Sequence, residues 1–294
     1  MILKKHSSRN EYVRAGDVWV RNFTKLQVPF LSLTGLFDKK DHQLVLANEY
    51  KNKGIGRISE EKVSMAKVVI ISDGYAYRWK HLLLAKMPKD VHVLAVNRAM
   101  RNWKLMSRRL PAHEQKSINA FIVNNPYPEC MSYLPGPDSP YFPTCIASTR
   151  TNHRFLEKYP GNKYVYEPST EESFGQTPTA RYCIDDYRNP ICAAIGLAFR
   201  FGVQRLMLIS CDDSFAESRD GAVELDNGLW TYPHHTRAHA IIDANLHWLT
   251  HQEEQEVAVA DWSDGPKYAN ANYISNEEEA LSFFRDNEEG TSND

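Results

Sequence analysis

The sequence lacks the features that mark several broad classes of protein. It contains no run of about eighteen apolar residues, so we expect no membrane-spanning helix. Residues 1–12, MILKKHSSRNEY, lack the apolar core of a secretory signal peptide, and this predicts a cytoplasmic protein. The formal net charge is only -2, which gives no reason to expect whole-chain attraction to nucleic acid or to an anionic membrane.

Cysteine is scarce and widely spaced. The five cysteines form no CxxC pair, so the sequence indicates neither a disulfide framework nor a zinc site. We therefore expect reduced thiols, with Cys192 and Cys211 packed as small core residues.

The short signatures of several enzyme families are missing as well. The sequence has no GxxxxGK[ST] phosphate loop, no GxGxxG, no GxSxG nucleophile elbow and no HExxH zinc motif. What is present is an ordinary globular composition, with 42% hydrophobic and 24% charged residues. A chain of 294 residues with this composition can bury one large core, or one core with a small appendage.

Strand and helix patterns alternate through the centre of the chain. KVVIIS (67–72), VHVLAVN (91–97) and INAFIVNNP (118–126) read as strands, and helical segments lie between them. This order predicts an α/β fold, a Rossmann-like and mostly parallel sheet with helices on both faces. We expect residues 63–285 to form this domain.

Other parts of the chain are predicted as additions to that domain. Residues 1–62 read as an N-terminal cap or hairpin, with strands at Val18–Val20 and Leu44–Leu46. Residues 126–188 are rich in proline and tyrosine, which is typical of a lid or subdomain over a site, although a surface excursion without function is the alternative. TCIAST and HRFLEKY within this stretch read as a short strand and a short helix. Residues 286–294 read as a disordered acidic tail.

The stretch from Asn189 to Asp213 reads as a capped helix followed by a buried strand. Asn189 can cap the helix, Pro190 suits its first turn, and Gly202 suits its C-terminal end. Leu206 to Ile209 is the apolar run of a strand. The stretch is either a structural unit with acidic loop residues or one side of a binding site.

Small polar residues follow each of the predicted strands. Ligands of open α/β sheets bind at the carboxyl ends of the strands, so these residues outline a candidate pocket. They are Ser72, Asp73 and Gly74 after the first strand, Asn97 after the second, Asn125 after the third, and Asp212 and Asp213 after the strand that ends at Ile209. The two aspartates would coordinate Mg²⁺ or accept hydrogen bonds from a ribose or base, or else only cap the following loop.

A second candidate cluster precedes the last long helix, in HHTRAH (234–239). The imidazole of His235 or His239 can act as a base near neutral pH, and Arg237 can hold a phosphate. His235 and His239 could also ligate a metal from one helix face. The alternative is a polar helix start with surface histidines.

Five segments occur in an order that resembles a known superfamily. They are KVVIISDGYAYRW, PKDVHVLAVNRA, FIVNNP, NPICAAIGLAFRFGVQRLMLISCDDSF and HHTRAHAIIDANLHWL, which together span residues 66–262. The chain looks like the bacterial lipooligosaccharide-type sialyltransferases and the related MptE-like group, which contains archaeal 6-hydroxymethylpterin diphosphokinases and flagellin-glycosylating motility accessory factors. It departs from the sialyltransferases at the first turn, where only Gly74 and a polar neighbour match, and at Arg188-Asn189-Pro190, where the family has Thr-Ser-Gly.

The resemblance implies transfer from a nucleotide-activated donor to an acceptor hydroxyl. By this resemblance, His235 or His239 is the base, Gly74, Asn97 and Asn125 contact the nucleotide, and Arg237 contacts phosphate. Asn189 corresponds to the family's contact position at the helix start, while Asp212 and Asp213 correspond loosely to a Gly-x-Asp strand ending.

The leading hypothesis is a glycosyltransferase that uses a nucleotide sugar and has no obligatory metal. The alternatives are a diphosphokinase that uses ATP and Mg²⁺, and a nucleotide-binding module without catalysis. The basic run 98–109 suggests an anionic acceptor, even a nucleic acid, but a solvated helix face is the favoured explanation. The resemblance also implies that a homo-oligomer is possible.

Overall fold

The structure is a computed structural model that describes the central part of the chain. It describes residues 39–56, 58, 64–73, 80–100, 118–134, 142–168, 183–184, 189–211, 223–224, 230–231, 233–252, 255–263, 265 and 267–285. The predicted strand Val18–Val20, the tail 286–294 and the candidate residues Gly74, Asp212 and Asp213 lie outside the described residues.

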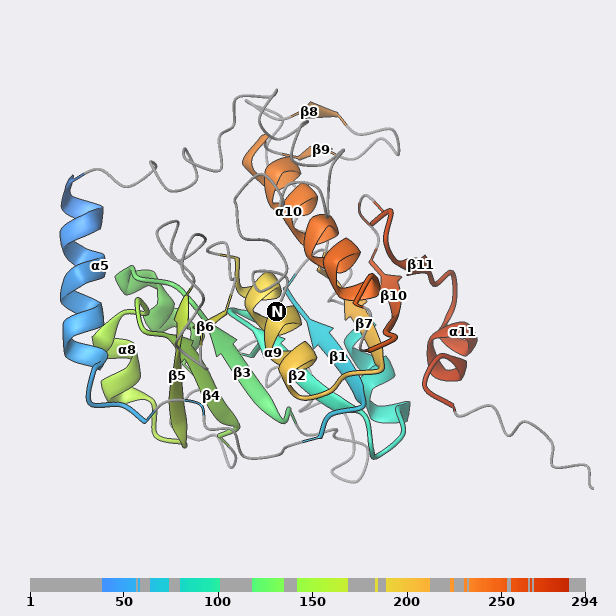
Figure 1. Ribbon diagram of the computed structural model, residues 1–294, viewed down its shortest axis with the longest axis horizontal. Helices are drawn as coiled ribbons and strands as arrows, with labels where there is room; N and C mark the ends of the chain where they lie inside the picture. Colours follow the sequence, from blue (N-terminus) through green and yellow to red (C-terminus); the bar gives the residue numbers. More distant parts are fainter. Residues whose placement is uncertain are drawn as a thin grey trace, which may run out of the picture.

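Nine strands form one sheet in which every neighbouring pair is parallel. The strands are β1 (Lys67–Ile71), β2 (His92–Val96), β3 (Ala120–Val123), β4 (Thr144–Ser148), β5 (Lys163–Pro168), β6 (Cys183–Ile184), β7 (Arg205–Ile209), β10 (Ala258–Trp262) and β11 (Asn272–Tyr273). Their order across the sheet is β11-β10-β7-β1-β2-β3-β4-β5-β6. The predicted α/β, Rossmann-like class is therefore confirmed (Figure 1).

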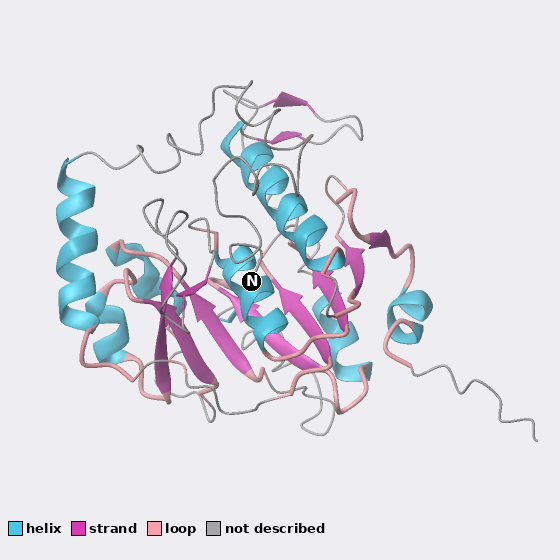
Figure 2. Ribbon diagram, in the orientation of Figure 1, coloured by secondary structure: helices cyan, strands magenta, loops and turns pink. Residues whose placement is uncertain are grey.

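Helices lie beside and across this sheet (Figure 2). They are α5 (Lys39–Asn52), α8 (His153–Lys158), α9 (Pro190–Arg200), α10 (Pro233–Thr250) and α11 (Glu277–Ser282), with the 3₁₀ helices η1 (His81–Lys86) and η3 (Pro128–Tyr133). A separate antiparallel pair, β8 (Val223–Glu224) and β9 (Trp230–Thr231), precedes α10. No helix in the described ranges has both the length and the apolar character that crossing a membrane requires.

Alternate side chains of the strands enter two different apolar clusters. Val68 and Ile70 of β1 pack in a cluster with buried residues of α9 and α10. Val69 and Ile71 pack in a second cluster, which includes buried residues of η1, α8 and α11. Because both sets of side chains are buried, the strands need continuous rather than alternating apolar sequences, as KVVII and RLMLI have.

The unit from Asn189 to Cys211 folds as its sequence predicts. The Asn189 side chain accepts a hydrogen bond from the backbone N–H of Ile191 at 2.8 Å, and Pro190 occupies the first turn of α9. Gly202 ends the helix region with a φ of 79°, in the left-handed region that glycine enters without steric cost. α9 packs across β1, β2 and β3 (Figure 1).

The expectation of a strand at Leu44–Leu46 is wrong, because these residues lie in α5. The buried positions Val45, Asn48 and Asn52 are spaced as one helical face, whereas Leu46 is half exposed. The inward face is mostly polar, so an apolar pattern could not reveal it.

The expectation of a lid or subdomain at residues 126–188 is also wrong for its described part. Residues 144–168 form β4, α8 and β5, and residues 183–184 form β6, all within or against the main sheet. The predicted strand TCIAST and helix HRFLEKY are confirmed as β4 and α8. The prediction took the many prolines and tyrosines as the mark of a lid. Tyr159 and Tyr166, however, are fully buried residues of the core.

Candidate functional site

The strand order creates one topological switch point. From β1 the chain adds β2 to β6 in one direction, and then returns to place β7 on the other side of β1. Connections on the two sides of such a point diverge, which leaves a crevice beyond the carboxyl ends of the strands where α/β proteins bind ligands. The candidate site is therefore the carboxyl edge of β7, β1 and β2, which we call the switch-point edge.

Both long helices of one face run from the carboxyl side of the sheet toward its amino edge. The end of α9 lies at the opposite, amino edge, because the carbonyl of Phe201 accepts a hydrogen bond from the N–H of Met65, just before β1. The end of α10 lies there too, because Gln255 donates to the carbonyl of Val203 just before β7. Helices running antiparallel to the strands direct their N-termini, with unpaired N–H groups, toward the carboxyl edge.

Two residues at the switch-point edge have a left-handed backbone. Asn97, directly after β2, has a φ of 48°, and Ser210, directly after β7, has a φ of 53°. This conformation is uncommon for residues other than glycine, and it often accompanies function. Across the described ranges these are the residues other than glycine that have a positive φ.

The same two residues hold buried polar atoms without hydrogen-bond partners. These atoms are Oδ1 of Asn97 and Oγ of Ser210, and Ser210 is fully buried. A buried polar atom without a partner costs free energy, so each such atom calls for an explanation. Asn97 and Ser210 each combine a strained backbone with a buried atom that has no partner. We therefore take this edge as the candidate binding site.

The turn after β1 lies between these two residues. Ser72 continues the sheet by donating its N–H to the carbonyl of Ile209 at 3.1 Å. The carboxylate of Asp73 lies 3.8 Å from the guanidinium of Arg98, in a largely exposed ion pair. Ser72, Asp73 and Asn97 therefore follow two neighbouring strands at the same edge of the sheet.

Asn125 and Asn189 are near the carboxyl edge but their side chains serve the fold. Asn125 accepts from the N–H of Tyr127 at 2.8 Å and donates to the hydroxyl of Tyr133 at 3.1 Å. The oxygen of Asn189 is used in capping α9. The predicted ligand contacts of these two residues therefore compete with internal hydrogen bonds.

The histidine cluster begins α10, which starts at Pro233. The side chains of His235 and Arg237 lie outside the described residues, so their positions relative to the site are not defined. The ring of His239 stacks on that of Tyr268 with centroids 4.2 Å apart and planes within 8°. The hydroxyl of Tyr268 donates to the carbonyl of Cys211 at 2.5 Å, which ties this imidazole to the end of β7.

The neighbouring strand β10 adds polar residues that the sequence reasoning missed. Asp261 is a fully buried carboxylate, and the hydroxyl of Ser263 accepts a hydrogen bond from the N–H of Cys211. The ammonium of Lys80 is buried, donates to the carbonyl of Trp262 at 3.1 Å and lies 5.1 Å from the centre of its ring. The ending ADWS carries the same signal of polar residues after a strand, but only the strand order places β10 beside β7.

Metal-ligating side chains do not gather in the described ranges. No group of three or more histidine, cysteine, aspartate or glutamate side chains is found there in an arrangement that could hold a metal ion. The proposed pairing of His235 with His239 on a metal is not tested, because the side chain of His235 is outside the described part of the chain.

None of the known protein-family models matches this chain, and none of the curated proteins matches it.

Proposed function

We propose that this protein is a cytoplasmic transferase that moves a sugar from a nucleotide-activated donor to an acceptor hydroxyl, with the donor bound at the switch-point edge. The pair of buried, unpartnered atoms, Asn97 Oδ1 and Ser210 Oγ, carries the proposal. A nucleotide offers hydroxyl and amino donors on one part and phosphate acceptors on another, so it can satisfy both atoms.

The surroundings of the two atoms support an anionic donor. The N-termini of α9 and α10 favour negative charge near this edge, and phosphates commonly bind at such helix ends. The buried ammonium of Lys80 adds a positive charge beside β10. The order of segments that resembles the sialyltransferase and MptE-like superfamily agrees with this chemistry.

The proposed chemistry needs a base and a leaving group. An imidazole of the HHTRAH cluster accepts the proton of the acceptor hydroxyl while the new bond between sugar and oxygen forms. The bond between sugar and donor phosphate breaks, and the nucleoside phosphate leaves with the electron pair. His239 is the cluster's described member, held against Tyr268, while His235 and Arg237 keep their proposed roles as base and phosphate ligand.

Calorimetric titration with CMP, UDP, GDP and ATP, each with and without Mg²⁺, tests the proposal. We expect metal-independent binding of CMP or UDP, weakened about tenfold or more by Asn97→Gly. Glycine removes the amide yet suits the left-handed backbone, so the fold is kept. Asn272→Gly, on exposed β11, is the matched control and should leave the affinity unchanged.

The other outcomes separate the alternatives. A diphosphokinase has some support from the carboxylates of Asp73 and Asp261 near the edge, and it requires ATP binding that depends on Mg²⁺. Binding without turnover, unchanged by His235→Ala and by His239→Ala, indicates a nucleotide-binding module. If no nucleotide binds to the unaltered protein, the proposal is overturned.

A further inference from the structure

The two unpartnered atoms of the switch-point edge differ in hydrogen-bond chemistry. Oδ1 of Asn97 is a carbonyl-type oxygen, which can only accept a hydrogen bond. Oγ of Ser210 is a hydroxyl oxygen, whose hydrogen can be donated. A phosphate oxygen without a proton can satisfy Ser210 but cannot satisfy Asn97.

Strand order places these atoms on opposite sides of β1. Asn97 follows β2 and Ser210 follows β7, and β1 lies between these two strands. Neighbouring strands lie about 4.8 Å apart, so two strand spacings separate the ends of β2 and β7 by about 10 Å. This span exceeds a single phosphate and suits a ligand with a sugar or base at one end and phosphate at the other.

The positive groups favour phosphate on the β7 side. The buried ammonium of Lys80 binds the carbonyl of Trp262, at the end of β10, and β10 is the strand next to β7. On the β2 side, Arg98 follows Asn97 in the chain, and its guanidinium already faces the carboxylate of Asp73 at 3.8 Å. Asp261 is the opposing negative charge on β10, in register with Leu208 and therefore two residues below the level of Ser210.

From these observations we propose that Ser210 is a phosphate-binding residue, and that a bound nucleotide lies across β1 with its nucleoside at Asn97 and its phosphate at Ser210. The inference rests on the proposed function and deepens it by stating in which orientation the donor binds. Asn97 Oδ1 accepts from a hydroxyl or amino group of the nucleoside, and Ser210 Oγ donates to a phosphate oxygen. The group to be transferred, attached beyond the phosphate, then lies on the β7 side, where His239 is tied to Cys211 through Tyr268.

A pair of glycine variants tests the direction, because both positions have a positive φ that glycine accepts. Cytidine, CMP and CDP, with uridine, UMP and UDP in parallel, are titrated into the unaltered protein, Ser210→Gly and Asn97→Gly. We expect Ser210→Gly to weaken the binding of CMP and CDP, or of UMP and UDP, by about 10- to 100-fold. The affinity for the nucleoside should be unchanged. Asn97→Gly should weaken the binding of the nucleoside and of its nucleotides by the same factor.

Stability provides the readout that separates binding from a structural role. Ser210→Gly removes a buried hydroxyl that has no partner, and glycine adopts the positive φ of this position without strain. The Tm of the variant should therefore be equal to or above that of the unaltered protein. Ser282→Gly, at an exposed position on α11, is the control and should bind normally.

Each failure has a different meaning. Suppose that the unaltered protein binds CMP or UMP. If Ser210→Gly binds the nucleotide equally well, or if its affinity falls equally for nucleoside and nucleotide, the proposed orientation of the ligand is wrong while the proposed function stands. If Ser210→Gly unfolds at a clearly lower temperature, the residue is structural and the assignment is overturned. If the unaltered protein binds none of these ligands, the direction and the proposed function fall together.

Discussion

At the residue scale, what a polar side chain does here depends on whether its hydrogen bonds are already made. Asn125 and Asn97 both follow a strand in similar sequence contexts. The side-chain oxygen of Asn125 accepts a hydrogen bond from the N–H of Tyr127, and its amide group donates to the hydroxyl of Tyr133. The side-chain oxygen of Asn97, in contrast, is buried without a partner. The second residue is therefore the better candidate for ligand contact.

The buried thiol of Cys130 gives a residue-scale prediction with a pH dependence. Burial, together with the nearby carboxylate of Glu129, raises the pKa of Cys130 from 9.0 to about 12. We expect this thiol to resist iodoacetamide in the folded protein at pH 9, because only the thiolate is nucleophilic. Mass spectrometry of labelled peptides measures the extent, with protein unfolded in urea as the fully reactive control. Rapid labelling of the folded protein would contradict the prediction.

The same raised pKa makes unfolding easier in alkali. Above pH 9 the unfolded chain loses the thiol proton while the folded chain keeps it, so the unfolded state binds fewer protons. The contribution of Cys130 to stability is therefore complete below pH 9 and is lost as pH rises toward 12. Cys130→Ala should reduce the loss of Tm between pH 8 and pH 10. An identical loss in the variant would show that other groups control the alkaline behaviour.

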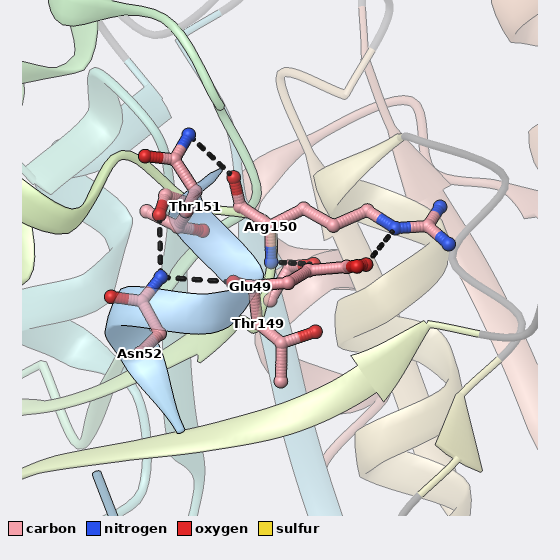
Figure 3. A network of polar contacts seen from close by, with 7 residues as sticks. Glu49, Asn52, Thr149, Arg150 and Thr151 are labelled. Carbon is pink, nitrogen blue, oxygen red and sulfur yellow. Dashed lines mark hydrogen bonds and ion pairs between the residues drawn. The ribbon is translucent and has the colours of Figure 1, made fainter. Parts of the chain in front are cut away.

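At the scale of elements, α5 is held to the domain by amide groups rather than by an apolar face (Figure 3). The side-chain amide of Asn52 donates to the carbonyls of Thr149 at 2.9 Å and Thr151 at 2.7 Å. Beside it, Arg150 forms an ion pair with Glu49 at 2.8 Å. Asn48 makes equivalent bonds to the carbonyls of Pro126 and Arg150.

Asn52→Ala should therefore loosen α5 locally. The variant leaves the buried carbonyl of Thr151 and the partly buried carbonyl of Thr149 without their donor, which costs about 1–3 kcal/mol. We expect amide hydrogen exchange in residues 44–52, followed by mass spectrometry, to accelerate about tenfold or more. Glu49→Gln is the control, since its partly exposed ion pair contributes only about 0–1 kcal/mol. Equal exchange in both variants would show that the amide bonds do not anchor the helix.

At the scale of the whole molecule, one sheet supports both apolar clusters. Ile70 faces the α9 and α10 side, and Val69 faces the side of η1, α8 and α11. Because adjacent residues of β1 hold the two clusters, neither face can lose its packing without disturbing the strand. The sheet and both layers should therefore unfold as one cooperative unit.

Core substitutions on the two faces should shift one common transition. Ile70→Ala should destabilise the protein by about 2–5 kcal/mol, and Val69→Ala by a smaller amount, since fewer buried carbons are removed. Urea unfolding followed by circular dichroism and by tryptophan fluorescence should give coincident curves for both variants. Leu46→Ala, half exposed on α5, is the control with little expected effect. Two separate transitions would show that the faces unfold independently.

Local sequence patterns predict the strands β1, β2, β3, β4 and β7, the parallel α/β class and the polar residues that follow these strands. They did not predict β5, β6 or β11. The predictive patterns are continuous apolar runs for strands buried on both faces, and the Asn189-Pro190 cap with Gly202 for α9. Ser72, Asp73 and Asn97 were found in this way, because a short polar ending after an apolar run is visible in one segment.

Which of those strand ends lie next to one another depends on the tertiary structure. The strand order places β7 beside β1 and β10 beside β7. It thereby draws attention to Ser210, Lys80 and Asp261, which the sequence reasoning had not named. The tertiary structure also shows that α5 is a helix. The polar face of α5 could not be recognised locally, because the hydrogen-bond partners of Asn48 lie up to 105 positions away in the chain. Whether a polar atom has a hydrogen-bond partner depends on residues distant in the chain, and this is why sequence patterns located the edge but not the unpartnered atoms within it.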